Sequence, residues 1–156
     1  MQNIYQSKRA FNKAFKEFIW QPHLVDLLDG CGWMDGGYRS LMKAFQLWLS
    51  DEDIQTYQIV KRRDCLHSEH ALIRLGSCYL DGDGLSSYQA LYQRWRYVER
   101  FPHVYIRVFE PKTEPANLAM KLPEEPFYIK EESIELIAKE LDATFDKKAL
   151  VLLMVG

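Results

Sequence analysis

One histidine and two aspartates have the types and spacing best suited to chemistry in this chain. In "HALIRLGSCYLDGDG" the residues on either side of Gly76-Ser77 have the alternation of a β-hairpin. A two-residue turn there places Asp83 directly opposite His70 and Asp81 diagonally from it. Either carboxylate would orient the imidazole through one ring nitrogen and leave the other nitrogen as a base, as in a Cys-His-Asp site. The alternative is an exposed histidine beside an acidic turn.

The candidate nucleophile is Cys31, in the glycine-rich stretch "DGCGWMDGG" at 29–37. A reactive cysteine usually needs a helix N-terminus or a nearby cation to lower the pKa of its thiol. Cys31 precedes the expected helix by several residues, so the loop would have to fold back to activate it. Backbone N–H groups near Gly36 and Gly37 would then supply an oxyanion site, with Trp33 in the same pocket.

Metal motifs in the chain are incomplete. Cys65, His67 and His70 are loosely spaced for zinc and no fourth ligand stands out. The "DGDG" at 81–84 begins like a calcium loop, but the twelfth position holds Tyr92 in place of glutamate. We therefore expect neither a metal nor another cofactor.

Hydrophobic periodicity predicts an α+β fold in which N-terminal helices pack on an antiparallel sheet. The helices are expected over 4–19, 22–29, 38–49, 86–101 and 130–145. In the fourth of these, Leu91, Trp95 and Val98 share the side expected to be buried. The strands are expected over 54–62, 70–75, 78–80, 103–111 and 149–155, the last as a buried apolar run and 103–111 as a candidate open edge.

Two stretches together resemble a known family. "GGYRSLMKAFQLWL" and "HALIRLGSCYLDGDGLSSYQALYQRW" are similar to small bacterial and mobile-element proteins with a papain-like, or NlpC/P60-like, cysteine-hydrolase core. The resemblance implies that His70 is the base and Asp81 the orienting acid, with Asp83 as a substitute. It places Tyr38 at the nucleophile position. The length of 156 residues fits one domain, 1–156. Within it the resemblance implies a papain-like core over about 30–100, and a strand-helix-strand extension is expected over 101–156.

The tyrosine at the nucleophile position leads to two hypotheses about the function. A phenol with a pKa near 10 is a poor acyl-transfer nucleophile, and its ring would fill the site. The first hypothesis is therefore a catalytically degenerate scaffold that binds or inhibits another protein, such as an anti-defence factor of a mobile element, with aromatic side chains anchoring the interface. The alternative is an active cysteine hydrolase or amidase that uses Cys31, His70 and Asp81.

Nucleic-acid binding is a third hypothesis, because "KRR" at 61–63 and "RWRYVER" at 94–100 mix arginines with aromatics. A net charge of −2 and the expected burial of Trp95 weigh against it. The chain lacks an apolar run of the roughly 18 residues that a membrane span needs. Three cysteines without framework spacing favour a reduced, cytoplasmic protein. The sequence leaves the oligomeric state open.

Overall fold

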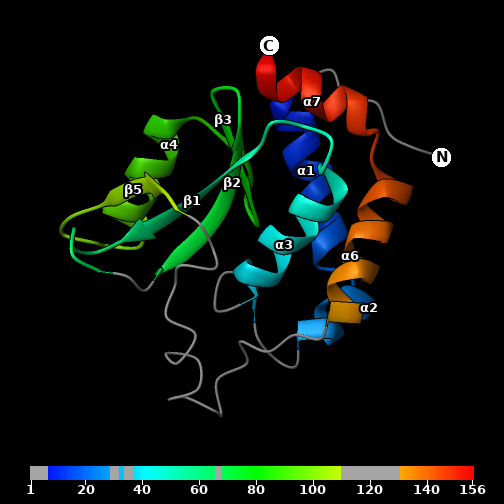
Figure 1. The fold of residues 1–156 in the computed structure, drawn as a ribbon, viewed down its shortest axis with the longest axis horizontal. Coiled ribbons are helices and arrows are strands. Elements are labelled where there is room, and N and C mark those ends of the chain that lie inside the picture. The colour runs from blue at the N-terminus through cyan, green and yellow to red at the C-terminus, as the bar shows by residue number, and fades with distance from the viewer. Residues whose placement is uncertain (1–6, 29–31, 34–36, 66–67, 110–130) are drawn as a thin grey trace.

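A five-stranded antiparallel sheet forms the centre of the protein (Figure 1). The computed structural model describes residues 7–28, 32–33, 37–65, 68–109 and 131–156. The strand order is β4-β3-β2-β1-β5. The strands are β1 (Gln55–Val60), β2 (His70–Leu75), β3 (Cys78–Asp81), β4 (Gly84–Ser86) and β5 (Tyr105–Val108). With the helices around it, this sheet confirms the expected α+β class.

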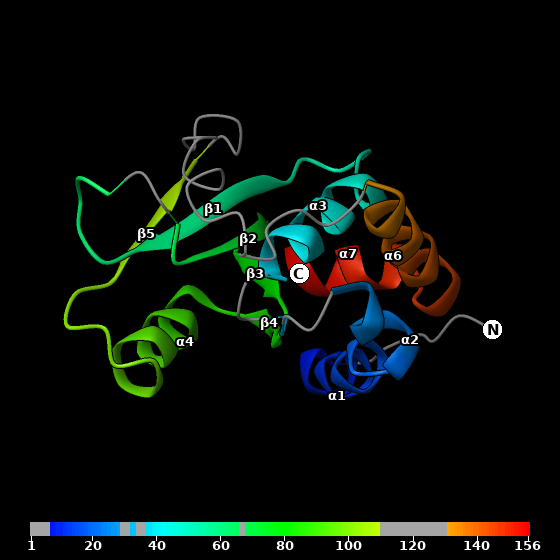
Figure 2. The same ribbon diagram turned by 90° about the horizontal axis from the view of Figure 1, so that it is seen from below.

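Helices cover both faces of the sheet. On one face lie α1 (Lys8–Ile19), α3 (Tyr38–Trp48) and α7 (Lys147–Val155), with α6 (Glu131–Thr144) and the short α2 (Pro22–Val25) on their outer side (Figure 2). A 3₁₀ turn, Asp26–Leu28, follows α2. The other face carries α4 (Tyr88–Gln93) and a π-helical turn, Arg94–Val98. Successive side chains of β2 point to opposite faces of the sheet, so they pack into two separate apolar clusters.

Phenylalanine side chains form the centre of the larger cluster. Helix α1 begins where the Ser7 hydroxyl accepts a hydrogen bond from the Ala10 amide at 3.1 Å. Its apolar residues recur at helical spacing, so one side of α1 is buried. The rings that meet there are Phe11, Phe15, Phe18, Phe45 and Phe145. Because Phe145 follows α6, the C-terminal part of the chain shares this core.

The two edges of the sheet differ. At β4 the side chain of Asn12 acts as a short substitute strand: its Oδ1 accepts from the Leu85 N–H at 2.6 Å and its Nδ2 donates to the Leu85 carbonyl at 3.0 Å. Gly84 allows this approach, since its φ of +94° and its contact with Asn12 leave no room for a Cβ. At the opposite edge β5 pairs only with β1 among the strands that the structure describes.

The prediction of a strand over 149–155 is wrong, because these residues belong to α7. The Asp146 carboxylate caps the helix by accepting from the Ala149 amide at 3.0 Å. Leu150 and Met154, four residues apart, are buried, whereas Leu152 between them is 70% exposed. That pattern has the period of a helix, and the C-terminal order is strand-helix-helix instead of strand-helix-strand.

The expected burial of Val98 is also wrong. After α4 the backbone widens into a π turn, in which the Glu99 amide donates to the Arg94 carbonyl. The extra residue per turn rotates Val98 away from the side shared by Leu91 and Trp95. Val98 is consequently 70% exposed, while Leu91 and Trp95 are buried as predicted.

Candidate functional site

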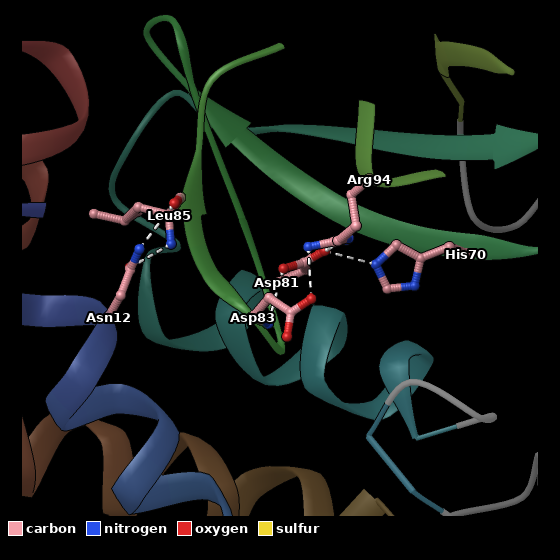
Figure 3. A network of polar contacts seen from close by, with 6 residues as sticks. All are labelled: Asn12, His70, Asp81, Asp83, Leu85 and Arg94. Atoms are coloured by element: carbon pink, nitrogen blue, oxygen red, sulfur yellow. Dashed lines mark hydrogen bonds and ion pairs between the residues drawn. The ribbon is translucent and has the colours of Figure 1, made fainter. Parts of the chain in front are cut away.

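His70 and Asp81 form a buried pair where β2 begins and β3 ends. The imidazole Nε2 lies 2.8 Å from Asp81 Oδ2, and both side chains are almost fully shielded from solvent (Figure 3). The hairpin register explains this, because Ile73 opposite Leu80 brings the start of β2 close to the end of β3. The alternative of an exposed histidine is therefore wrong.

A salt-bridge network extends the pair to a third element. Arg94, in the π turn, donates from Nη2 to Asp81 Oδ2 at 2.5 Å, and its Nη1 lies 2.8 Å from Asp83 Oδ2 (Figure 3). The expectation that Asp83 faces His70 is wrong. The chain reverses after Asp81, so that Asp81 pairs with Gly84 and Asp83 stands in the turn, bonded to Arg94.

The carboxyl of Asp81 is held in its charged form. Burial alone would raise its pKa, but the hydrogen bond from His70 and the charge of Arg94 more than offset this effect. A further donor, the Asp83 amide, bonds to Oδ1 at 2.9 Å. The pKa of Asp81 therefore lies far below its ordinary value, and at neutral pH the carboxylate accepts from three groups.

Two aromatic rings enclose the imidazole. The Tyr38 ring from α3 has its centroid 5.1 Å from that of His70, and the Trp95 ring is 5.0 Å away at an interplanar angle of 31°. His70 Nδ1 is buried without a hydrogen-bond partner among the described residues. The adjoining space between α3 and the sheet, beside Tyr38, Leu41 and Asp81, is too small for a water molecule.

The hydrogen bonds assign the tautomer of His70. A carboxylate only accepts, so Nε2 carries a proton, and in the neutral imidazole Nδ1 then has a free lone pair. This is the arrangement of a general base oriented by an acid. However, the imidazole is fully buried, and Asp81 already balances the charge of Arg94. The carboxylate is thus less able to stabilise an imidazolium.

The other predicted site residues are dispersed or lie outside the described residues. Cys31 and Gly36 are among the latter, so the predicted contact of Cys31 with His70 is neither shown nor excluded. Trp33 is a core residue whose Nε1 donates to the Ile19 carbonyl at 2.6 Å. The Gly37 N–H donates to the Gly32 carbonyl at 3.0 Å, which makes it unavailable to an oxyanion.

Tyr38 occupies the first turn of α3, as predicted, and is buried. Its hydroxyl donates to the Ser68 carbonyl at 3.1 Å, and its ring packs against the imidazole of His70. The phenol therefore closes one side of the imidazole and also ties α3 to the segment that leads into β2.

No cluster of metal ligands is present in the part of the chain that the structure describes. Of the loose zinc set, His70 uses Nε2 for Asp81, Cys65 is partly exposed, and His67 lies outside the described residues. The aspartates of the "DGDG" turn bond to His70 and Arg94.

Arg94 is a site residue that the sequence does not predict, because its local sequence places it among the arginines of the nucleic-acid hypothesis. Its spacing contains a usable signal. Arg94 follows the buried Leu91 by three residues and so belongs to the side of the helix that faces the sheet. An arginine at such a position indicates a buried acidic partner.

Comparison of the chain with protein-family models, with curated proteins and with solved structures gives no match. Within the described ranges no helix is long and apolar enough to cross a membrane.

Proposed function

We propose that this protein is a non-catalytic, papain-like scaffold that acts by binding another protein, as an inhibitory or anti-defence factor of a mobile element. The observation that carries the proposal is the enclosure of His70. Its imidazole is 0% exposed, and its ring is covered by Tyr38 and Trp95. The negative charge of its partner Asp81 is balanced by the positive charge of Arg94. A catalytic base needs access to substrate, whereas a structural histidine needs the burial observed here.

The surface of α4 and the adjacent sheet supports a protein partner. Tyr88 is 51% exposed and packs near Tyr79, which forms an edge-to-face pair with Tyr57. The Arg74 guanidinium lies over both sheet tyrosines and donates to the Tyr57 hydroxyl at 2.6 Å. Tyr57 and Tyr79 are themselves buried, so the groups available to a partner are the exposed Tyr88 and the partly exposed Arg74. Tyrosine and arginine are typical of interface hot spots, and Arg74 suits an acidic side chain of the partner.

The proposal predicts that two variants have different effects on binding of a protein partner. Tyr88→Asp places a charge on the proposed interface and should abolish retention of a partner by the immobilised protein, while Cys31→Ala should leave it unchanged. Lys139→Asp, on the exposed side of α6, is the matched surface control. Loss of the biological effect in a folded Cys31→Ala variant would overturn the non-catalytic assignment.

An active cysteine hydrolase remains the second candidate, because the free lone pair of His70 Nδ1 and the bond of Nε2 to Asp81 suit a base. The two candidates differ in the reactivity of Cys31 with iodoacetamide. An unactivated thiol has a pKa of about 8.5 and slows roughly tenfold per pH unit below it. We expect that behaviour. A rate that stays high at pH 6 and falls on His70→Gln substitution would establish the hydrolase.

A further inference from the structure

Cationic and aromatic side chains gather at the end of the molecule formed by β5, the β1–β2 connection and the π turn. We call this the basic end and define it as residues 61–65 and 96–108. Lys61 lies 5.0 Å from the ring centroid of Phe101, the Arg63 guanidinium 5.4 Å from that of Tyr105, and the Arg96 guanidinium 5.2 Å from that of Tyr97. Segments distant in sequence thus contribute to one surface.

The charge of the protein is segregated. The basic end contains six Lys and Arg against two Asp and Glu, although the whole chain has a net charge of −2. Glu69, just outside it, lies 3.9 Å from Lys61. Helix α6, on the opposite side of the molecule in Figures 1 and 2, has five acidic residues and one lysine. The field of the basic end therefore attracts anions despite the acidic net charge.

One part of the basic end is a stacked platform. His103 and Tyr105 stack with ring centroids 6.5 Å apart at 30°, and the Arg63 guanidinium lies near the same tyrosine ring. His103 and Arg63 are exposed and Tyr105 is partly exposed. Flat π surfaces beside guanidinium groups accept nucleobases by stacking while the cations contact phosphates.

Arg107 fixes this platform from beneath. Its Nε donates to Gln58 Oε1 at 2.7 Å, its Nη1 to the Arg63 carbonyl at 2.6 Å, and its Nη2 to the Cys65 carbonyl. Gln58 is itself buried and donates to the Ser68 hydroxyl at 2.7 Å. The loop that carries Arg63 is thus held against β5 before any ligand arrives, which lowers the entropic cost of binding.

The backbone conformation of Arg100 also bears on this surface. Arg100 has φ +62°, and it is the one non-glycine residue with positive φ among those described. The left-handed turn ends the π turn, because the Phe101 amide donates to the Trp95 carbonyl at 3.0 Å, and glycine is the usual residue at such a helix end. The Arg100 side chain is exposed there, so it is available to a ligand.

We propose that the basic end binds single-stranded nucleic acid, with bases stacking on Tyr105 and His103 and phosphates contacting Arg63 and Arg100. Arginine predominates over lysine here, and the His103 ring is exposed and the Tyr105 ring partly exposed, which favours splayed bases over the regular backbone of a duplex. This inference is independent of the proposed protein-binding function, which uses the α4 surface.

The test is fluorescence anisotropy of labelled (dT)20 with the full chain in 50 mM NaCl. Tyr105→Ala should weaken binding at least about fivefold, and Tyr105→Phe should restore it, because the ring is the stacking surface. Arg63→Ala should weaken binding and reduce the slope of log K against log salt by about 0.7. Lys139→Ala removes an exposed cation from α6 and should leave the affinity unchanged.

Arg100→Gly separates binding from folding. Glycine relieves the left-handed backbone, so this variant should be at least as stable as the parent in thermal melts and yet bind (dT)20 more weakly. The proposal is overturned if (dT)20 fails to bind, if Lys139→Ala weakens binding as much as Arg63→Ala, or if Arg100→Gly binds as well as the parent. Equal binding of poly-L-glutamate would also overturn it, and would indicate an acidic protein ligand.

Discussion

The ion pair between Asp81 and Arg94 should make a large, coupled contribution to stability. Arg94→Met keeps most of the side-chain volume but leaves the Asp81 carboxylate, 3% exposed, without its guanidinium. Removing one partner of a buried pair typically costs about 3–5 kcal/mol. Because His70 and the Asp83 amide still donate to the carboxylate, we expect the lower end, about 3 kcal/mol.

The double-mutant cycle distinguishes a specific pair from general loss of packing. Asp81→Asn should cost about 2 kcal/mol, since Arg94 retains Asp83 at 2.8 Å. The double variant should cost about 2 kcal/mol less than the sum of the single changes, because neither charge is then left alone. Urea denaturation at pH 7 gives the free energies, with m-values checked for constancy.

Arg96→Met is the matched control for this cycle. Arg96 is only partly exposed but contacts Tyr97 instead of a buried acid, so its substitution should change the free energy of unfolding by less than about 0.5 kcal/mol. A coupling energy between Asp81 and Arg94 below about 0.5 kcal/mol would refute the reasoning, since the network would then be a geometric coincidence without energetic coupling.

Three other changes test other parts of the structure. The depressed pKa of Asp81 provides stability that is complete above about pH 5 and is lost as the pH falls, since the unfolded carboxyl has a pKa near 3.9. Asp81→Asn should therefore reduce the acid dependence of the unfolding free energy. Asn12→Ala should cost about 1–2 kcal/mol by leaving both backbone groups of Leu85 unpaired, and increased aggregation on heating would show that the edge had opened. Leu150→Ala should cost about 2–4 kcal/mol, whereas Leu152→Ala should be nearly neutral in thermal melts; equal effects would contradict the helix at the C-terminus.

The parts of the site that depend on local geometry could be predicted from the sequence. Gly76 and Ser77 mark a hairpin turn, the turn sets the register, and the register brings His70 close to Asp81. The start of α3 at Tyr38 follows equally from local periodicity. In each case the information lies within about a dozen residues.

What the sequence did not predict depends on contacts between distant elements. Arg94 reaches Asp81 only because the π turn packs across the sheet face. The spacing of Arg94 from Leu91 indicates a buried acidic partner but does not identify which carboxylate it is. The run at 149–155 is apolar enough for either a strand or a helix. Its state is decided by the Asp146 cap and by the position of Leu150 in the shared core.

The Asn12 amide has a consequence for assembly. A sheet with two open edges can recruit strands on both sides and grow without limit, whereas here α1 has already filled one side. Among the strands that the structure describes, pairing between copies would then be restricted to β5. Two molecules joined in that way would form a continuous ten-stranded sheet with an asparagine at each outer boundary. Assembly by strand pairing would stop at a dimer. The Asn12 side chain would thus prevent this pairing from continuing into a fibre.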